Sequence, residues 1–523
     1  MSLISVNNLT FGYETSYENI FENTSFEIDT DWKLGFIGRN GRGKTTFLKL
    51  LMGKNKYSGT ITTSTKFDYF PFETEGDLSA LDTARNAIAP FGFWEEEMNK
   101  CIAVNSENSM NKYGEILDLY VYHDGYIINE LIEKEIRKLQ VSTDVLSRPF
   151  NTLSNGERTK LKLAALFLKK NNFLLIDEPT NHLDLEGRNC VAEYLNSKKG
   201  FILVSHDRHF LDSTVDHILS INKNNIEVQK GNFSSWQENK NRQDNFEINK
   251  NEKLKKDINQ LEDSFRRTAG WSDKVEKSKI GEHSPDRGYI GHKAAKMMKR
   301  AKSIERRKEN SIDEKKKLLK NIEKYDSLKI IPMDYLKTTL INIDNLNVSY
   351  NERTIINNIS LTINKGDRVA LRGKNGSGKS TILKILTGEI KNYKGTVSIG
   401  SNLNISYVPQ DTSLLSGSFS DFISNENINE SIFRTLLAKL DMDSDDFSKN
   451  LKELSEGQKK KVLIAKSLSQ SSHIYIWDEP LNFIDVYSRL QIEELIKEFE
   501  PTMIFVEHDF KFNENIATKV IEL

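Results

Sequence analysis

The chain has 523 residues, 37% of them hydrophobic, and a formal net charge of −1. One hydrophobic core does not serve a chain of this length, so several compact units are expected. The apolar stretches are only of strand length, and the start has no basic region followed by an apolar run, which predicts a cytoplasmic protein without membrane association. The two cysteines, Cys101 and Cys190, have no paired metal-ligand spacing, so neither a disulfide framework nor a zinc site is expected.

The near-zero net charge conceals an uneven distribution. Residues 237–326 contain 25 Lys/Arg and 17 Asp/Glu, a net of +8, which leaves about −9 for the remainder. This concentration of positive charge marks a segment that differs in character from the rest of the chain.

An internal repeat defines the organisation of the chain. Four blocks recur in the same order: residues 38–46 and 373–381, 153–157 and 454–458, 176–179 and 477–480, and 204–207 and 506–509. The first pair lies 335 positions apart and the next two lie 301 apart, so the first copy carries about 34 extra residues. Residues 80–145 have a helical pattern, and we expect a helical insertion there.

The first repeated block has the sequence Gly-x-x-x-x-Gly-Lys-[Ser/Thr] between an apolar run and a helical pattern, as a phosphate-binding loop requires. Lys44 and Lys379 are expected to contact the β/γ-phosphates of ATP, and Thr45 and Ser380 to bind Mg²⁺. Further contacts are expected from Gly38, Asn40, Gly41, Gly43, Thr46, Gly373, Asn375, Gly376, Gly378 and Thr381.

Two carboxylates follow a predicted strand in each half. Asp177 and Asp478 are expected to hold Mg²⁺, and Glu178 and Glu479 to polarise the attacking water. The alternative is a solvated acidic loop, but such a loop has no reason to recur after the same two blocks in both halves.

Leu-Ser-x-Gly-[Glu/Gln] ahead of the Asp-Glu strand, with a lone histidine after it, resembles the signature and switch of the ATP-binding-cassette family. The resemblance covers both halves and implies an α/β fold with nucleotide-binding domains at 1–236 and 336–523. In that family two lobes pack head to tail, so each ATP lies between the phosphate loop of one lobe and the signature of the other. The first site would combine Lys44, Thr45, Asp177, Glu178 and His206 with Ser455 and Gly457. The second would combine Lys379, Ser380, Asp478, Glu479 and His508 with Ser154 and Gly156.

Two aromatic residues upstream of the phosphate loops, Tyr13 and Tyr350, resemble the family residue that stacks on adenine. The alternative for each is a core tyrosine at a strand end.

The sequence also departs from the family pattern. A metal-binding glutamine is usual where the first half has Phe72, whereas the second half keeps Gln410. Asn155 and Glu456 replace a signature glycine, and Glu507 replaces the serine before the switch histidine. We therefore expect two unequal sites that both hydrolyse ATP, at different rates.

Between the lobes, residues 237–335 predict a basic α-helical hairpin linker with a tip at roughly 268–291, where Gly270 and later glycines interrupt the pattern. Residues 287–304 contain no acid. A basic helix beside aromatic residues is typical of a nucleic-acid partner, and a solvated spacer is the alternative.

The tandem cassette, the runs at 177–184, 231–236 and 295–302, and this linker together resemble the ABC-F translation factors, most closely the Lsa-type antibiotic-resistance branch. The resemblance implies a monomer that binds ribosomal RNA and peptidyl-site transfer RNA in the exit site of the bacterial ribosome. It would displace lincosamides, streptogramin A or pleuromutilins from the ribosome. A housekeeping factor that relieves stalled ribosomes and the ATPase subunit of a membrane transporter are the alternatives.

Overall fold

The structure is a computed structural model that describes residues 2–13, 19–74, 77–104, 106–170, 172–181, 183–221, 226–277, 328–330, 332–350 and 353–523. The chain divides into two compact units. One comprises residues 1–234 and 325–523, which contain both nucleotide-binding lobes, and the other comprises residues 235–324.

The first lobe is built on a six-stranded sheet with the order β5-β6-β7-β3-β8-β9. Its first five strands are parallel and β9 is antiparallel. A three-stranded antiparallel sheet, β2-β1-β4, packs with it around a shared apolar core. The strands are β1 (Leu3–Phe11), β2 (Phe21–Asp29), β3 (Lys33–Gly38), β4 (Ser58–Thr62), β5 (Lys66–Phe70), β6 (Asn172–Asp177), β7 (Phe201–Val204), β8 (His217–Ile221) and β9 (Ile226–Lys230).

The parallel strands follow from their sequence, because a strand covered on both faces is apolar along its whole length. Phe173, Leu174, Leu175 and Ile176 in β6 are all buried. The strand therefore carries the acids that follow it to one edge of the sheet. The helices of this lobe are α1 (Lys44–Leu51), α2 (Ala80–Ile88), α3 (Phe91–Val104), α4 (Glu107–Tyr122), α5 (Ile128–Lys138), α6 (Asn155–Leu168), α7 (Leu185–Asn196) and α8 (Arg208–Thr214), with 3-10 turns at Thr143–Ser147 and Phe150–Thr152.

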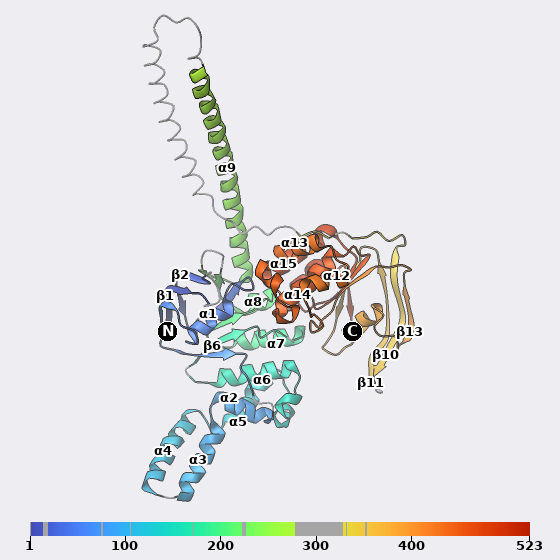
Figure 1. Cartoon of the computed structure of the whole chain (residues 1–523). Coiled ribbons are helices and arrows are strands. Elements are labelled where there is room, and N and C mark those ends of the chain that lie inside the picture. The colour runs from blue at the N-terminus through green and yellow to red at the C-terminus, as the bar shows by residue number, and fades with distance from the viewer. Residues whose placement is uncertain are drawn as a thin grey trace, which may run out of the picture. The chain divides into compact units, whose positions relative to one another are not determined.

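The predicted helical insertion contains α2 to α5, and Figure 1 shows α3 and α4 side by side as a hairpin. Ser106 begins α4 with a capping box, in which Ser106 and Ser109 satisfy each other's backbone N–H groups. Local capping thus fixes where the second arm of the hairpin begins.

The second lobe repeats the architecture with a five-stranded parallel sheet, β14-β15-β16-β12-β17, and a three-stranded antiparallel sheet, β11-β10-β13. Its strands are β10 (Thr339–Tyr350), β11 (Arg353–Asn364), β12 (Arg368–Arg372), β13 (Lys394–Ile399), β14 (Ile405–Val408), β15 (Ile474–Asp478), β16 (Met503–Val506) and β17 (Lys519–Glu522). Its helices are α11 (Lys379–Leu386), α12 (Phe419–Asn425), α13 (Glu430–Lys439), α14 (Glu456–Ser469), α15 (Val486–Phe499) and α16 (Phe510–Ile516), with 3-10 turns at Ser444–Ser448 and Leu451–Glu453. The predicted fold class is confirmed.

The linker differs from the prediction at its C-terminal bound and at its tip. The second unit ends at Lys324 rather than at residue 335, because Leu328 and Ile330 are buried in the core of the second lobe and Met333 N–H donates to Ser472 O at 2.9 Å. At the predicted tip, α9 (Phe233–Lys277) continues through Gly270, so this glycine does not interrupt the helix. Residues 278–327, with most of the predicted tip, its basic run and the second helix, lie outside the described residues.

Candidate ATP sites

Each phosphate loop joins a buried strand to a helix through a glycine that no other residue replaces without strain. Gly43 caps α1 with φ 88°, and a Cβ there would lie 2.4 Å from Ile20 Cγ2. Gly378 caps α11 with φ 95°, and a Cβ there would lie 2.6 Å from Ile356 Cγ1. These glycines set up two helix N-termini, whose free N–H groups favour bound phosphate.

The loop lysines are held in the same way in both lobes. Lys44 Nζ donates to Gly38 O at 2.7 Å, and Lys379 Nζ donates to Gly373 O at 2.8 Å. Burial lowers the pKa of both lysines, while the carboxylates of both lobes oppose the shift. Each ammonium group therefore lies inside its loop, where phosphate oxygens are expected.

The second ATP site, built on the loop at 373–381, contains a cavity of about 660 Å³ lined by both lobes. A cavity of this volume lies within the range of small-molecule and cofactor sites. The structure thus brings the second phosphate loop and the first signature to one cavity, as the resemblance implies. Among the lining residues are Ser154, Gly156, Asn375, Gly376, Gly378, Lys379, Ser380, Thr381, Gln410, Glu479 and His508.

The oxygens around Asp478 fit a magnesium ion. Asp478 is 1% exposed, and its two carboxylate oxygens are buried with Ser380 as their hydrogen-bonding neighbour. Ser380 and Gln410, which supply a hydroxyl and an amide oxygen, line the cavity of the second site together with Glu479, the residue after Asp478. Burial, together with the charge of Glu479, raises the pKa of Asp478 to about 6. A hard cation with oxygen ligands would satisfy these atoms.

Glu479 follows Asp478 in a left-handed backbone conformation, with φ 47°. Its Oε1 lies 3.5 Å from His508 Nε2, and its Oε2 accepts from Asn482 Nδ2 at 2.5 Å. Burial alone would raise the pKa of Glu479, but His508 and Gln410 outweigh it and lower this pKa to about 2. Glu479 is therefore an anion at neutral pH.

The first ATP site, built on the loop at 38–46, is in contact with the second lobe. Asn40 Nδ2 donates to Phe483 O at 2.9 Å, and a Cβ on Gly457 would lie 3.0 Å from the same nitrogen. Arg39 forms an ion pair with Asp441 at 3.0 Å. The second signature glycine therefore lies against the first phosphate loop.

The acid of the first site is engaged by the protein itself. Asp177 Oδ2 accepts from Thr45 Oγ1 at 2.9 Å and from Tyr69 OH at 2.8 Å. Phe72 has no side-chain oxygen, and its ring lies under Lys162 Nζ at 5.2 Å from the centroid. The first site therefore offers fewer available oxygens to Mg²⁺ than the second.

Glu178 has the same backbone conformation as Glu479, with φ 51°, and its Oε1 lies 3.5 Å from His206 Nε2. This oxygen is buried without a hydrogen bond. Burial and the charge of Asp177 raise the pKa of Glu178 to about 8. Burial, with the charges of Lys44 and Arg489, holds the pKa of His206 well below its usual value, so that the imidazole is neutral.

The remaining predicted residues lie near the loops. Ser154 and Ser455 cap α6 and α14 with capping boxes. The Tyr13 side chain is 42% exposed, which argues against a core tyrosine. Its hydroxyl oxygen lies 3.0 Å from Thr46 Oγ1. Tyr350 is the last residue of β10, and its side chain lies outside the described part of the structure. Gly41 has φ 83° within the first loop.

Sequence reasoning missed several residues that shape the sites. Tyr69 recurs as Tyr407 at an offset of 338, and this repetition could have marked it. Asn482 was not recognised as a partner of Glu479. Lys461 and Asp485 form a buried ion pair at 3.2 Å, and both act on the charge of Lys44.

The fold and the two loops define a tandem phosphate-loop ATPase. A family model described as "ABC transporter" matches residues 21–181 and 356–482, more than half of the chain. The chain belongs to this family of ATP-binding and ATP-hydrolysing proteins. Among the residues that the structure describes, no helix is long and apolar enough to cross a bilayer.

Sequence similarity to known proteins covers nearly the whole chain. "Putative ATP-binding protein YdiF" of Bacillus subtilis (strain 168) is 29% identical over 543 residues, which cover 100% of this chain and 80% of that protein. "Energy-dependent translational throttle protein EttA" of Escherichia coli (strain K12) is 26% identical over 538 residues, which cover 96% of this chain and 89% of that protein. A solved archaeal complex of "ribosomal stalk protein aP1 and archaeal ribosome recycling factor aABCE1" matches with a TM-score of 0.58 at 17% identity, covering 98% of this chain and 87% of that one. At this identity the structural match shows the fold alone.

Proposed function

We propose that this protein is an ABC-F-type factor that binds the bacterial ribosome in an ATP-dependent manner and protects it from peptidyl-transferase-centre antibiotics. The observation that carries the proposal is a complete tandem ATPase interrupted by a separate unit, residues 235–324, which contains most of the basic segment. Similarity to the translational throttle protein over 96% of this chain supports a role in translation.

In the proposed cycle ATP closes the two lobes on each other, and hydrolysis lets them separate. Lys379 and the N–H groups of the second loop hold the phosphates, while Asp478, Ser380 and Gln410 would hold Mg²⁺. The ion neutralises charge on the transferring phosphoryl group when bound.

The proton-transfer roles belong to the strand-end glutamates. Glu479 is charged and lies beside His508, so it suits the task of orienting and polarising the attacking water. At the first site we assign the water-orienting role to Glu178 beside His206, with Lys44, Thr45 and Asp177 on phosphate and metal. Because the pKa of Glu178 is raised to about 8, this carboxyl must lose its proton before it can accept one from water.

The basic linker is the proposed ribosome-binding part, since Lys and Arg side chains contact phosphates of RNA. In this proposal the protein acts as a cytoplasmic monomer in the exit site, and the segment near 268–291 displaces peptidyl-site transfer RNA and the bound drug.

The first experiment traps the ATP-bound state with Glu178→Gln and Glu479→Gln together and measures co-sedimentation with bacterial ribosomes. Binding should require ATP and be lost when residues 268–291 are replaced by a short Gly/Ser loop. Lys44→Ala with Lys379→Ala is the matched control that prevents ATP binding. A trapped protein found with membranes instead of ribosomes would favour a transporter subunit.

A housekeeping factor that relieves stalled ribosomes is the second candidate, and similarity to the throttle protein favours it. Susceptibility of cells to lincosamides, streptogramin A and pleuromutilins, with and without the gene, distinguishes the two. Unchanged susceptibility together with ATP-dependent ribosome binding would support the housekeeping role.

A further inference from the structure

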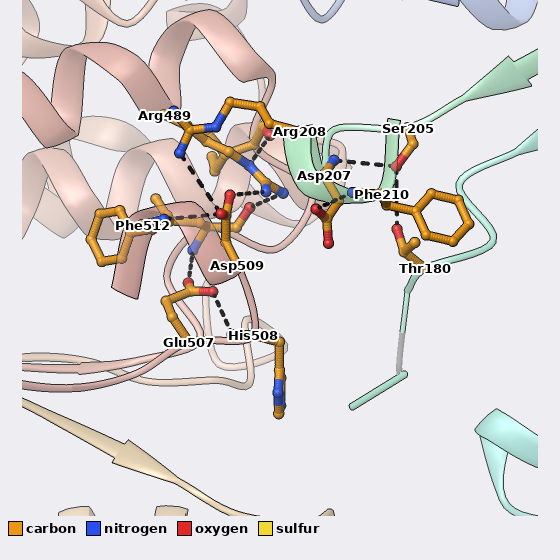
Figure 2. A network of polar contacts seen from close by, with 12 residues as sticks. Thr180, Ser205, Asp207, Arg208, Phe210, Arg489, Glu507, His508, Asp509 and Phe512 are labelled. Atoms are coloured by element: carbon orange, nitrogen blue, oxygen red, sulfur yellow. Dashed lines mark hydrogen bonds and ion pairs between the residues drawn. The ribbon is translucent and has the colours of Figure 1, made fainter. Parts of the chain in front are cut away.

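The residue before the switch histidine differs between the lobes, and so does its partner. In the first lobe Ser205 is buried, and its hydroxyl oxygen lies 3.4 Å from the hydroxyl oxygen of Thr180. Ser205 Oγ also accepts a hydrogen bond from Asp207 N–H at 3.2 Å. Figure 2 shows this side-chain pair between the loop after β6 and the start of α8. The pair joins the turn after the catalytic glutamate to the segment that carries His206.

The second lobe has Glu507 in place of Ser205 and Leu481 in place of Thr180. Leucine has no hydroxyl, so the side-chain pair of the first lobe cannot form. The longer glutamate reaches the backbone instead. Glu507 Oε1 accepts from Leu481 N–H at 2.7 Å, and Oε2 accepts from His508 N–H at 3.1 Å. Figure 2 shows the second of these contacts.

Both oxygens of this carboxylate therefore accept from backbone N–H groups. Burial raises the pKa of Glu507 to about 7, while Arg489 and the Leu481 N–H favour the anion. Glu507 is 5% exposed and Leu481 is fully buried, so water does not supply the same contacts. Arg489 supports the arrangement through Nη2, which donates to Leu481 O at 2.9 Å, and Asn513 Nδ2 donates to Glu507 O at 2.9 Å.

The two N–H groups belong to the segments that carry the catalytic pair. Leu481 follows Glu479 by two residues, and Glu479 has a left-handed φ of 47° that the surroundings must hold in place. His508, whose Nε2 lies 3.5 Å from Glu479 Oε1, is the residue next to Glu507. One carboxylate thus ties together both ends of the Glu479–His508 contact.

We infer that Glu507 is a positioning residue for ATP hydrolysis at the second site, and that Glu507 with Leu481 replaces the Ser205–Thr180 pair of the first site. The two substitutions compensate each other, because leucine offers no hydroxyl to a serine and a serine is too short to reach the backbone of Leu481. Glu507 acts through the segments that carry Glu479 and His508.

The test measures single-turnover ATP hydrolysis in Glu178→Gln protein, where only the second site retains its glutamate. Glu507→Ser should lower the rate constant by roughly tenfold or more, because catalysis is sensitive to displacements of about 1 Å. The half-saturating ATP concentration should change little, since Lys379 and its loop are untouched. Glu507→Ser with Leu481→Thr rebuilds the first-lobe pair and should recover most of the rate.

A combined variant no faster than Glu507→Ser would overturn the inference, as would a rise in half-saturating ATP at an unchanged rate. If Glu507→Ser does not fold, the reciprocal exchange decides the question in Glu479→Gln protein, which reports on the first site. There Ser205→Glu should be slow, and Ser205→Glu with Thr180→Leu should be faster. Equal rates for these two variants would also contradict it.

Discussion

The two strand-end glutamates that we propose as catalytic, Glu178 and Glu479, occupy equivalent places in the two lobes and yet differ in charge. Glu178 and Glu479 each follow a buried strand, adopt a left-handed backbone and lie 3.5 Å from a histidine Nε2. The pKa of Glu178 is raised to about 8 and that of Glu479 is lowered to about 2. The residues that surround a catalytic group, rather than its position in a motif, therefore determine its protonation.

The surroundings explain the difference. Asn482 donates to Glu479, and His508 and Gln410 lower its pKa, whereas Glu178 Oε1 is buried without a hydrogen bond. Phe72 stands where the second lobe has Gln410, so the first site lacks one polar group that could stabilise the anion. Four predictions test this comparison.

The largest effect is expected from removing both glutamates. Glu178→Gln with Glu479→Gln should reduce ATP turnover by about 10²–10⁴-fold, because both sites lose the group that polarises water. Steady-state phosphate release measures the loss, and retained binding of a fluorescent ATP analogue is the control for folding. Turnover within tenfold of the unaltered protein would show that other groups act as the base.

Exchanging Gln410 and Phe72, which occupy the position that we propose for metal binding, should alter the Mg²⁺ requirement. Gln410→Phe should raise the Mg²⁺ concentration needed for half-maximal hydrolysis at the second site by about 10–100-fold, since a polar group near the metal is lost. Phe72→Gln is the reciprocal variant and should lower the requirement of the first site. Titrations of Mg²⁺ in single-site backgrounds measure both effects, and unchanged curves would remove this position from the metal site.

Neutralising each glutamate should change stability in opposite directions. Glu178 has a raised pKa, so its ionisation opposes folding from about pH 4.5 upward and fully above about pH 8. Glu178→Gln should therefore raise stability at pH 8 by about 1–3 kcal/mol and have little effect near pH 5.

Glu479 provides the matched control, because its lowered pKa contributes stability that is present above about pH 4.5 and is lost as the pH falls towards 2. Glu479→Gln should lower stability at pH 8. Thermal unfolding of the nucleotide-free and metal-free variants measures both shifts. Two shifts of the same sign would contradict the assigned protonation states.

The smallest effect is expected at the acid of the first site. Tyr69→Phe removes one hydrogen bond to Asp177 and leaves that from Thr45, which should cost about 0.5–1.5 kcal/mol of stability. Tyr407→Phe in the second lobe is the comparison variant. An unchanged unfolding midpoint for Tyr69→Phe would show that the hydroxyl contributes nothing there.

Much of this molecule was predictable from the repeat. Each half of the sequence contains a strand, a phosphate-binding loop and a helix in the same order. This order predicts a parallel sheet in each lobe with the strand-end acids at one edge, and both lobes have this arrangement. The departures at Phe72 and Glu507 predicted unequal sites. The contact between the second signature and Asn40 was expected only from the family resemblance. Sequence periodicity carries no information about contacts between two distant lobes.

Other features were not readable from the pattern. The protonation of Glu178 depends on its burial and on the charge of Asp177, and the extent of burial is a property of the packed structure. The predicted linker extends beyond Lys324 because its composition is charged almost throughout. Two apolar residues within it, Leu328 and Ile330, are instead buried in the hydrophobic core of the second lobe. Gly270 did not end a helix because a single glycine costs only about 1 kcal/mol in a long one.

The most direct test of unequal sites is single-turnover hydrolysis of Glu178→Gln and Glu479→Gln proteins, measured side by side over a range of Mg²⁺ concentrations. The first variant reports on the second site and the second variant on the first. We expect two different rate constants and a higher Mg²⁺ requirement in Glu479→Gln protein, where Phe72 and the engaged Asp177 leave fewer oxygens for the metal. Superimposable rates and Mg²⁺ curves would contradict it.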